Sequence, residues 1–236
     1  MKRLLATIRW DFVRQYRNGF WAASAFFALI SAAVLQGIRG QAWIHAELAV
    51  PALLMLNLII TTYFYVAALV LLEKDEGTLA GLAVTPLRPT EYLLGKIVSL
   101  TLLGMVETLL VVTLVWGTGF RPLPILAGMV MLGALYTLIG FVAVARYDAI
   151  NAYLLPAGVG VGLLILPLVD HLHLWRSPIF WLHPAQPALV LLRTAFTRTP
   201  LWETTYGLLG GAFWLCLSLL WARHVFHRFV IRTAGD

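Results

Sequence analysis

Six long apolar runs separated by short connectors constrain this chain more than any other feature. Each run has about the 20 residues that an α-helix needs to cross a hydrocarbon core roughly 30 Å thick. Charged residues make up only 12% of the chain, whereas about a quarter is usual in soluble domains. We therefore predict an all-α membrane protein, a single domain over residues 1–236, with six transmembrane helices at 20–38, 50–72, 97–117, 123–145, 152–169 and 205–222.

The Lys and Arg residues are distributed unevenly between the two sides that six spans define. Twelve of the 17 lie in the terminal segments and in the second and fourth connectors, and five lie in the other connectors. Because cytoplasmic connectors carry the excess of Lys and Arg, we predict a multi-pass protein of the cell membrane with both termini in the cytoplasm. These cations flank the spans, so the expected counter-charge is the anionic surface of the lipid bilayer and not nucleic acid.

Residues 1–18 are basic and amphipathic. Leu5, Ile8 and Phe12 follow the helical spacing i, i+3 and i+7, with arginines on the opposing face. This pattern is typical of a helix that lies in the membrane interface. We predict such an interfacial elbow helix, which acts either as a lever on the first span or as a passive anchor.

The connector at residues 73–89 concentrates charge in a chain that has little. The hydroxyl of Thr78 can cap the start of a helix, and Pro86 disfavours helical geometry at the residue before it. The short helix between them would carry three apolar side chains on one face, those of Leu79, Leu82 and Ala83. A short helix of this kind, displayed in the cytoplasm, is suited to a groove on another protein.

Glu107 is the one carboxyl group deep inside a predicted span. Burying it costs at least a few kcal/mol, so it needs a partner, a water-filled cavity or a proton. Two interpretations follow. Glu107 either lines a translocation path or gate, or it is a protonated or hydrogen-bonded structural residue.

The connector at residues 170–203 is long and interrupted by prolines. We predict a pair of short re-entrant helices here, because non-helical backbone at membrane depth is tolerated when protein surrounds it. His171, His173 and His183 raise the alternative of a metal or haem site, but no matching Cys or carboxylate ligands accompany them. We expect no metal and no cofactor, and assign the histidines to an interfacial belt with the nearby tryptophans.

Two pairs of glycines recur at four-residue spacing, Gly158 with Gly162 and Gly207 with Gly211. This spacing lets helix backbones approach closely inside a bilayer. Close packing is therefore expected in the fifth and sixth spans.

A nucleotide-binding motif is absent from the sequence. The pair Gly95 and Lys96 is followed by Ile97 and lacks the glycine five positions earlier that a phosphate-binding loop requires. The spans also lack a nucleophile or metal cluster at depth, so we expect no catalytic residues. ATP hydrolysis, if the chain depends on it, must take place in another subunit.

The stretch EKDEGTLAGLAVTPLRPTEYLLGK resembles the loop E-[KR]-[DE]-x-G-T-L-x-x-L-x-V-T-P-L-x-x-x-E-[YF]-x-x-x-K of permease subunits in type-2 ATP-binding cassette (ABC) exporters, especially their fluoroquinolone-export branch. The elbow helix, the six spans, the glutamate of the third span and WLHPAQPALVLLRTAF match the same plan, so the resemblance covers nearly the whole chain. Ala80 and Gly81 depart from the commoner pattern. The motif positions are Glu73, Glu76, Gly77, Thr78, Leu79, Leu82, Thr85 and Pro86.

The resemblance implies that the connector is a coupling helix seated in a cleft of a cytoplasmic ATPase. It implies a permease that works with two ATPase copies and a second permease, identical or homologous, and exports a drug-like or amphiphilic small molecule. Two alternatives stay open. One is a haem, cofactor or lipid export permease of the same superfamily, and the other is a membrane-embedded enzyme.

Overall fold

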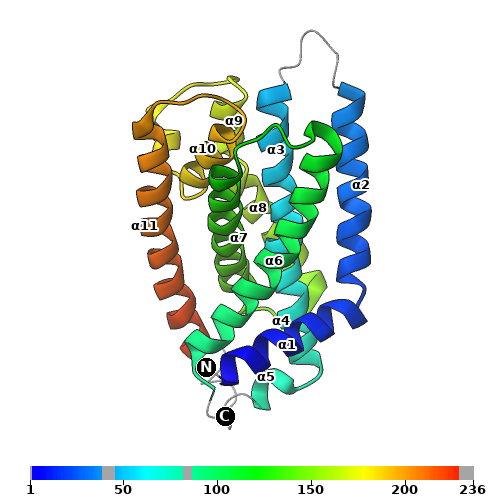
Figure 1. The fold of residues 1–236 in the computed structure, drawn as a ribbon. Coiled ribbons are helices and arrows are strands. Elements are labelled where there is room, and N and C mark those ends of the chain that lie inside the picture. The colour runs from blue at the N-terminus through cyan, green and yellow to red at the C-terminus, as the bar shows by residue number, and fades with distance from the viewer. Residues whose placement is uncertain (1, 39–45, 82–86, 229–236) are drawn as a thin grey trace.

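The computed structural model describes residues 2–38, 46–81 and 87–228, and these ranges contain helices and no strand (Figure 1). Within these ranges, six helices are long and apolar enough to cross a membrane, which confirms the predicted fold class. The spans are α2 (Phe20–Ile38), a continuous stack of α3 (Ala46–Leu58), η1 (Ile59–Phe64) and α4 (Tyr65–Asp75), α6 (Pro89–Trp116), α7 (Pro122–Val144), α8 (Ile150–Leu164) with α9 (Pro167–His171), and α11 (Leu201–Phe226).

The third span starts earlier than the hydropathy pattern indicates, at Pro89 and not at residue 97. Pro89 occupies the first turn, where its missing N–H is not needed. The Glu91 carboxylate accepts a hydrogen bond of 2.9 Å from the backbone N–H of Arg88 and so caps the helix start. Lys96, which the sequence assigns to the connector, is therefore one full turn and more inside α6.

The second span and α7 form the centre of the bundle. In the apolar stretches of these two spans, 72% and 67% of the residues are buried. In those of α2, α8 and α11, the share is between 22% and 28%. α7 contacts α6, η1, α4, α11 and the short α10 (Gln186–Thr194). The three outer helices consequently present apolar faces to whatever surrounds the bundle.

Helix α1 (Lys2–Arg17) lies across one end of the bundle, beside the four-residue helix α5 (Thr78–Gly81) (Figure 1). Gly19 makes the turn into α2 with a φ of +76°, a value that residues other than glycine rarely adopt. Asp11 and Gln15 face inward and are buried, whereas Trp10 and Tyr16 are exposed. The predicted helix is confirmed, but its buried residues are polar, and Leu5 of the predicted apolar face is 63% exposed.

At the opposite end, the connector before α11 folds into short helices. These are the 3-10 helix η3 (Pro178–Leu182) and α10, which follow α9 at the end of the fifth span, and α10 packs against α7, α11 and α3. The guanidinium of Arg121 donates hydrogen bonds to the carbonyls of Thr194 and Thr197 and so occupies the end of α10, where a positive charge is favourable.

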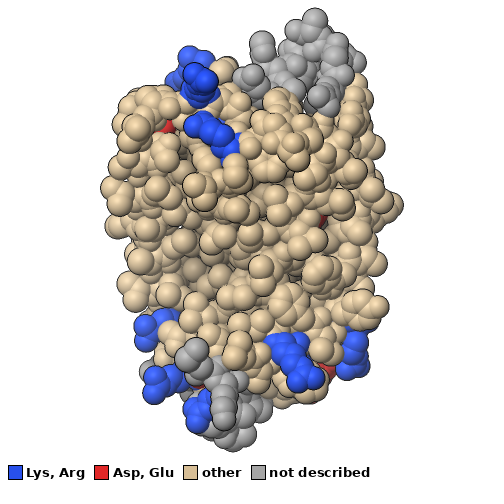
Figure 2. Space-filling model, in the orientation of Figure 1, with Lys and Arg blue, Asp and Glu red and all other residues tan. Residues whose placement is uncertain are grey.

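On the face shown in Figure 2, Lys and Arg side chains gather at the two ends of the molecule, and the band between them has none. This is the pattern expected of a bundle whose middle lies in hydrocarbon. The chain is a membrane protein by length and composition of its helices.

The two glycine pairs behave differently. A Cβ atom at Gly207 would lie 2.6 Å from Cγ of Leu191, and one at Gly211 would collide with Sδ of Met131. Within the described residues, nothing lies within 4 Å of such an atom at Gly158 or Gly162. The prediction of close packing is confirmed for α11. In α8 it is wrong for the pair Gly158 and Gly162, whereas Gly160 lies on a different face and is packed tightly against the hydroxyl of Tyr63.

Candidate functional site: a buried ion cluster at the end of the second span

Three helices meet at the carboxylate of Glu73, in the last turn of α4. Its Oε1 accepts hydrogen bonds of 2.6 Å from Arg14 of α1 and of 2.6 Å from Nζ of Lys96. Its Oε2 accepts one of 2.6 Å from the hydroxyl of Tyr92. Tyr92 and Lys96 are four residues apart on α6, so both side chains reach the same face. One carboxylate thus joins α1, α4 and α6.

Lys96 also binds a second carboxylate. Its Nζ lies 2.5 Å from Oδ1 of Asp11, and its side chain is only 1% exposed. Buried ions persist only when their charges are paired, and here two carboxylates surround two cations. We name this set the elbow cluster, defined as Asp11, Arg14, Glu73, Tyr92 and Lys96. Burial raises the pKa of Asp11, and the positive charge of Lys96 opposes that rise.

The sequence predicted only Glu73 among the residues of the elbow cluster. One signal was available, because Asp11 is the single acidic residue among the first 18 and stands in a segment with five cations. An isolated acid on the inner face of a basic helix is a candidate for a buried partner.

The start of α5 is held by the same arginine. Nη2 of Arg14 donates hydrogen bonds of 3.1 Å to Glu76 and of 3.1 Å to the hydroxyl of Thr78. That hydroxyl donates to the carbonyl of Glu73 at 3.2 Å, so it closes the end of α4. Gly77 makes the turn between the two helices with a φ of +67°.

Leu79 does not lie on a displayed face, contrary to the sequence interpretation. Its side chain is 4% exposed and belongs to the apolar core of the chain. Among the residues of this segment whose side chains the structure describes, Asp75 to Thr78 are exposed. The remaining predicted residues of the coupling motif lie outside the described residues, namely Leu82, Thr85 and Pro86, together with Ala83 from the predicted apolar face.

Lys74 ties the end of α4 to the end of α7. Its Nζ donates to the carbonyls of Ala145 and Tyr147, at 2.8 and 2.7 Å, and lies 3.0 Å from the carboxylate of Asp148. The C-terminal carbonyls of a helix favour a cation. Most charges of the connector therefore act within the chain.

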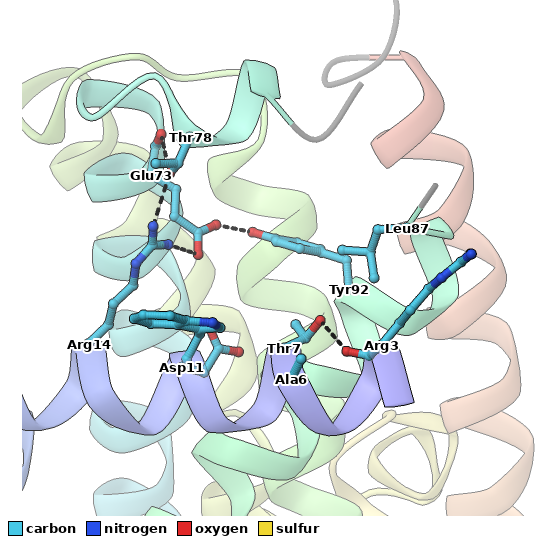
Figure 3. A pocket seen from close by; sticks show the side chains of 10 residues that line it. Arg3, Ala6, Thr7, Asp11, Arg14, Glu73, Thr78, Leu87 and Tyr92 are labelled. Atoms are coloured by element: carbon cyan, nitrogen blue, oxygen red, sulfur yellow. Dashed lines mark hydrogen bonds and ion pairs between the residues drawn. The ribbon is translucent and has the colours of Figure 1, made fainter. Parts of the chain in front are cut away.

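A pocket of about 370 Å³ opens between α1 and the start of α6. Figure 3 shows Arg14, Glu73 and Thr78 linked by hydrogen bonds on one side and Leu87 and Arg3 on the other. The acidic and basic groups of the elbow cluster already pair with each other. The pocket is therefore a mainly apolar hollow at this end of the molecule.

Glu107 is separate from the elbow cluster. It is 3% exposed, and its Oε2 is hydrogen-bonded to the hydroxyl of Thr61 in η1. The same stretch of the second span holds Asn57, whose amide oxygen accepts a hydrogen bond of 2.8 Å from Ser31 of α2. A polar contact between α6 and the second span thus lies inside the membrane region.

Two of the three histidines at the opposite end, His171 and His183, are hydrogen-bonded within the chain. Nε2 of His171 bonds the carbonyl of Leu48, and Nε2 of His183 bonds that of Leu163. Nδ1 of His183 accepts from the backbone N–H of Ala185, so neither nitrogen of that ring is open to a ligand. Within the described residues no three His, Cys, Asp or Glu side chains are grouped to hold a metal.

Comparison with known proteins gives a consistent result. A family model described as the fluoroquinolones export permease protein family matches residues 2–234. Two curated relatives, from two strains of Mycobacterium tuberculosis, are called fluoroquinolones export permease proteins. Each is 32% identical to this chain, and the match covers 100% of this chain and 99% of the relative. With six spans, an elbow helix and a near-complete match of this kind, the chain belongs to the fluoroquinolones export permease protein family.

Proposed function

We propose that this permease is the membrane subunit of an ATP-driven exporter of drug-like amphiphiles. Its partners are two copies of a cytoplasmic ABC ATPase and a second permease subunit, identical or homologous. The names of the relatives make fluoroquinolones the first substrates to test. The observation that carries the proposal is the elbow cluster, which ties the predicted coupling segment to two other helices.

A movement of α5 would be transmitted to the spans by the hydrogen bonds of the elbow cluster. Arg14 holds Glu73, Glu76 and Thr78 from α1, while Lys96 and Tyr92 hold Glu73 from α6. Breaking one partner out of a buried ion pair typically costs about 3–5 kcal/mol, so these helices resist separation. Closure of an ATPase dimer against α5 would therefore move α1, α4 and α6 together. This favours the elbow helix as a lever over a passive anchor.

The docking surface would be the exposed rim of the segment. Asp75, Glu76, Gly77 and Thr78 are exposed, and Leu82, Thr85 and Pro86 continue the motif of the family loop. Leu79 supports this surface from beneath. The rim carries two acidic side chains, so we expect basic side chains in the facing cleft of the ATPase.

The orientation follows from charge. α1, α5 and the end of α11 lie at the same end of the bundle, and most Lys and Arg residues belong to that end (Figure 1). By the positive-inside rule this end faces the cytoplasm of a cell-membrane protein. The short helices of residues 170–203 would then dip into the outer leaflet, with α10 covered by α7 and α11.

We place Glu107 beside the export path. It sits where α6 meets η1, a π-helical turn of six residues. Such turns are rare and occur frequently at functional sites. Because Glu107 is 3% exposed within this chain, it would act on the path through the packing of α6 against the second span and not by binding the substrate directly.

The test is to purify the tagged chain from its native membranes in mild detergent and to identify the proteins that accompany it. An ABC ATPase and a permease subunit are the expected partners. The variant Asp75→Arg should reduce recovery of the ATPase several-fold, because it reverses a charge on the docking rim. The matched variant Asp148→Arg makes the same charge change at a side chain that is 91% exposed outside that rim, and should recover the ATPase as the wild type does. Equal recovery with both variants would exclude the rim as the docking surface, and absence of an ATPase from the wild type would overturn the function.

A further inference from the structure

The hydroxyl of Thr61 has two oxygen neighbours and only one hydrogen to donate. Its Oγ1 lies 3.0 Å from the carbonyl of Asn57 and is also hydrogen-bonded to Oε2 of Glu107. An ionised carboxylate can only accept hydrogen bonds. If Glu107 were ionised, the carbonyl of Asn57 and the carboxylate would compete for the single hydrogen of Thr61. In one of the two contacts, two oxygen atoms would then lie together with no hydrogen between them.

A proton on Glu107 resolves the conflict. The carboxyl O–H then donates to Oγ1 of Thr61, and Thr61 donates its own hydrogen to the carbonyl of Asn57. Both contacts become ordinary hydrogen bonds, arranged as a chain from α6 into the second span. We propose that Glu107, Thr61 and the carbonyl of Asn57 form a proton-binding site, and that the proton is bound in this conformation.

The burial of Glu107 supports the same assignment. Its Oε1 is buried and has no hydrogen bond within geometric limits among the described residues, although the hydroxyl of Ser24 on α2 lies near the carboxyl, and no described cation forms an ion pair with Glu107. An unpaired charge in such a place is strongly disfavoured, whereas the carbonyl oxygen of a neutral acid tolerates the lack of a partner better.

The surrounding charges do not replace the proton. Lys96 is eleven residues earlier on α6, about 16 Å along the helix axis, and is engaged by Asp11 and Glu73. The titratable group that faces Glu107 is the phenol of Tyr65 on α4, whose oxygen lies 3.5 Å from the hydroxyl of Ser24 on α2. α2 and α7 carry no charged residue, those of α1 and α4 lie in the elbow cluster or at the surface of that end, and those of α11 lie in its first and last turns.

The site links two helices that the proposed function requires to move. Loss of the proton would leave Thr61 with one hydrogen for two acceptors, which weakens the contact between α6 and η1. The helix stack that contains η1 ends at Glu73 and α5. This consequence for coupling rests on the proposed function, whereas the presence of the proton does not.

Infrared spectroscopy of the chain in lipid nanodiscs tests the site directly. A protonated carboxylic acid has a C=O stretch separate from that of a carboxylate. We expect this band at about pH 7, well above the ordinary glutamate pKa of about 4.3, and we expect it to vanish in Glu107→Gln. The glutamine amide can donate to Thr61 in the same way, so this variant keeps the hydrogen-bond chain and the fold.

Two further variants identify the acceptor of the proton. Thr61→Val keeps the shape of the side chain but removes the hydroxyl, and should shift the acid band to higher wavenumber because the O–H loses its partner. Thr113→Val is the control, since the Thr113 hydroxyl bonds carbonyls of its own helix and its loss should leave the band in place.

Absence of a band that depends on Glu107 between about pH 5 and pH 8 would overturn the proposal. A band that Thr61→Val does not shift would overturn the assignment of Thr61. If the band behaves as expected but no ATPase accompanies the chain, the proton site stands and the proposed function fails.

Discussion

Glu73 at the end of α4 and Lys96 within α6 form a contact of 2.6 Å, with side chains that are 5% and 1% exposed. Both read as connector charges in the sequence, yet they are a buried pair between two spans. Together with Asp11 and Arg14, this pair connects α1, α4 and α6 at one end of the bundle.

Glu73→Gln should destabilise the fold by about 3–5 kcal/mol, because it leaves the buried Lys96 with Asp11 alone and Arg14 with only the exposed Glu76. Thermal unfolding of the detergent-purified protein measures the effect. Glu76→Gln is the matched control, since Glu76 meets the same Arg14 but its side chain is 43% exposed, and should change stability by less than about 1 kcal/mol. Equal unfolding temperatures for the two variants would show that the elbow cluster does not hold the helices together.

Leu79→Ala should destabilise the chain by about 2–5 kcal/mol, because it empties a space in the core under the coupling segment. Leu5→Ala, at a side chain that is 63% exposed at the same end, should have little effect in the same unfolding assay. Full stability of Leu79→Ala together with lost ATPase pairing would instead place Leu79 in the partner interface.

Gly207→Ala should lower the unfolding temperature, since its Cβ would lie 2.6 Å from Leu191 and 3.1 Å from the backbone carbonyl of Pro187. Gly158→Ala should be neutral or slightly stabilising, because open space surrounds that position and alanine favours a helix by about 1 kcal/mol over glycine. The opposite order of stabilities would mean that α8, and not α11, packs on the bundle through its glycines.

Acidification should weaken the end of the bundle that holds His183. Burial lowers the pKa of His183, and its Nδ1 must stay unprotonated to accept from Ala185. The unfolded chain therefore binds the proton more readily, so the stabilisation is complete above the ordinary histidine pKa of about 6.5 and is lost as pH falls through the lower folded value. The fall in unfolding temperature between about pH 7.5 and pH 5 should be smaller in His183→Gln than in the wild type. An identical pH profile for the two proteins would contradict this role.

Glu107→Gln should behave as a permanently protonated permease. In an efflux assay with vesicles that hold the ATPase, export by the wild type and by the variant should coincide at low pH, where Glu107 keeps its proton. The rates should diverge as pH rises, and the variant should lose the pH dependence that Glu107 contributes. Parallel pH profiles would show that proton release at Glu107 has no part in the transport cycle.

The sequence by itself determined the class of protein and its membrane plan. Hydrophobicity is a property of each residue, and the thickness of the bilayer sets how long an apolar run must be, so six spans and an interfacial helix follow without tertiary information. The motif around Glu73 and Thr78 likewise identified the family, which the relatives confirm.

Only the tertiary structure decided which side chains meet. Lys96 binds Asp11 across 85 residues of sequence, and Thr61 bonds Glu107 across 46. The direction of a side chain depends on how each helix is rotated about its axis against its neighbours, and apolar runs that are hydrophobic on every side do not encode that rotation. For the same reason the two glycine pairs look alike in sequence, yet one is packed against its neighbours and the other faces outward.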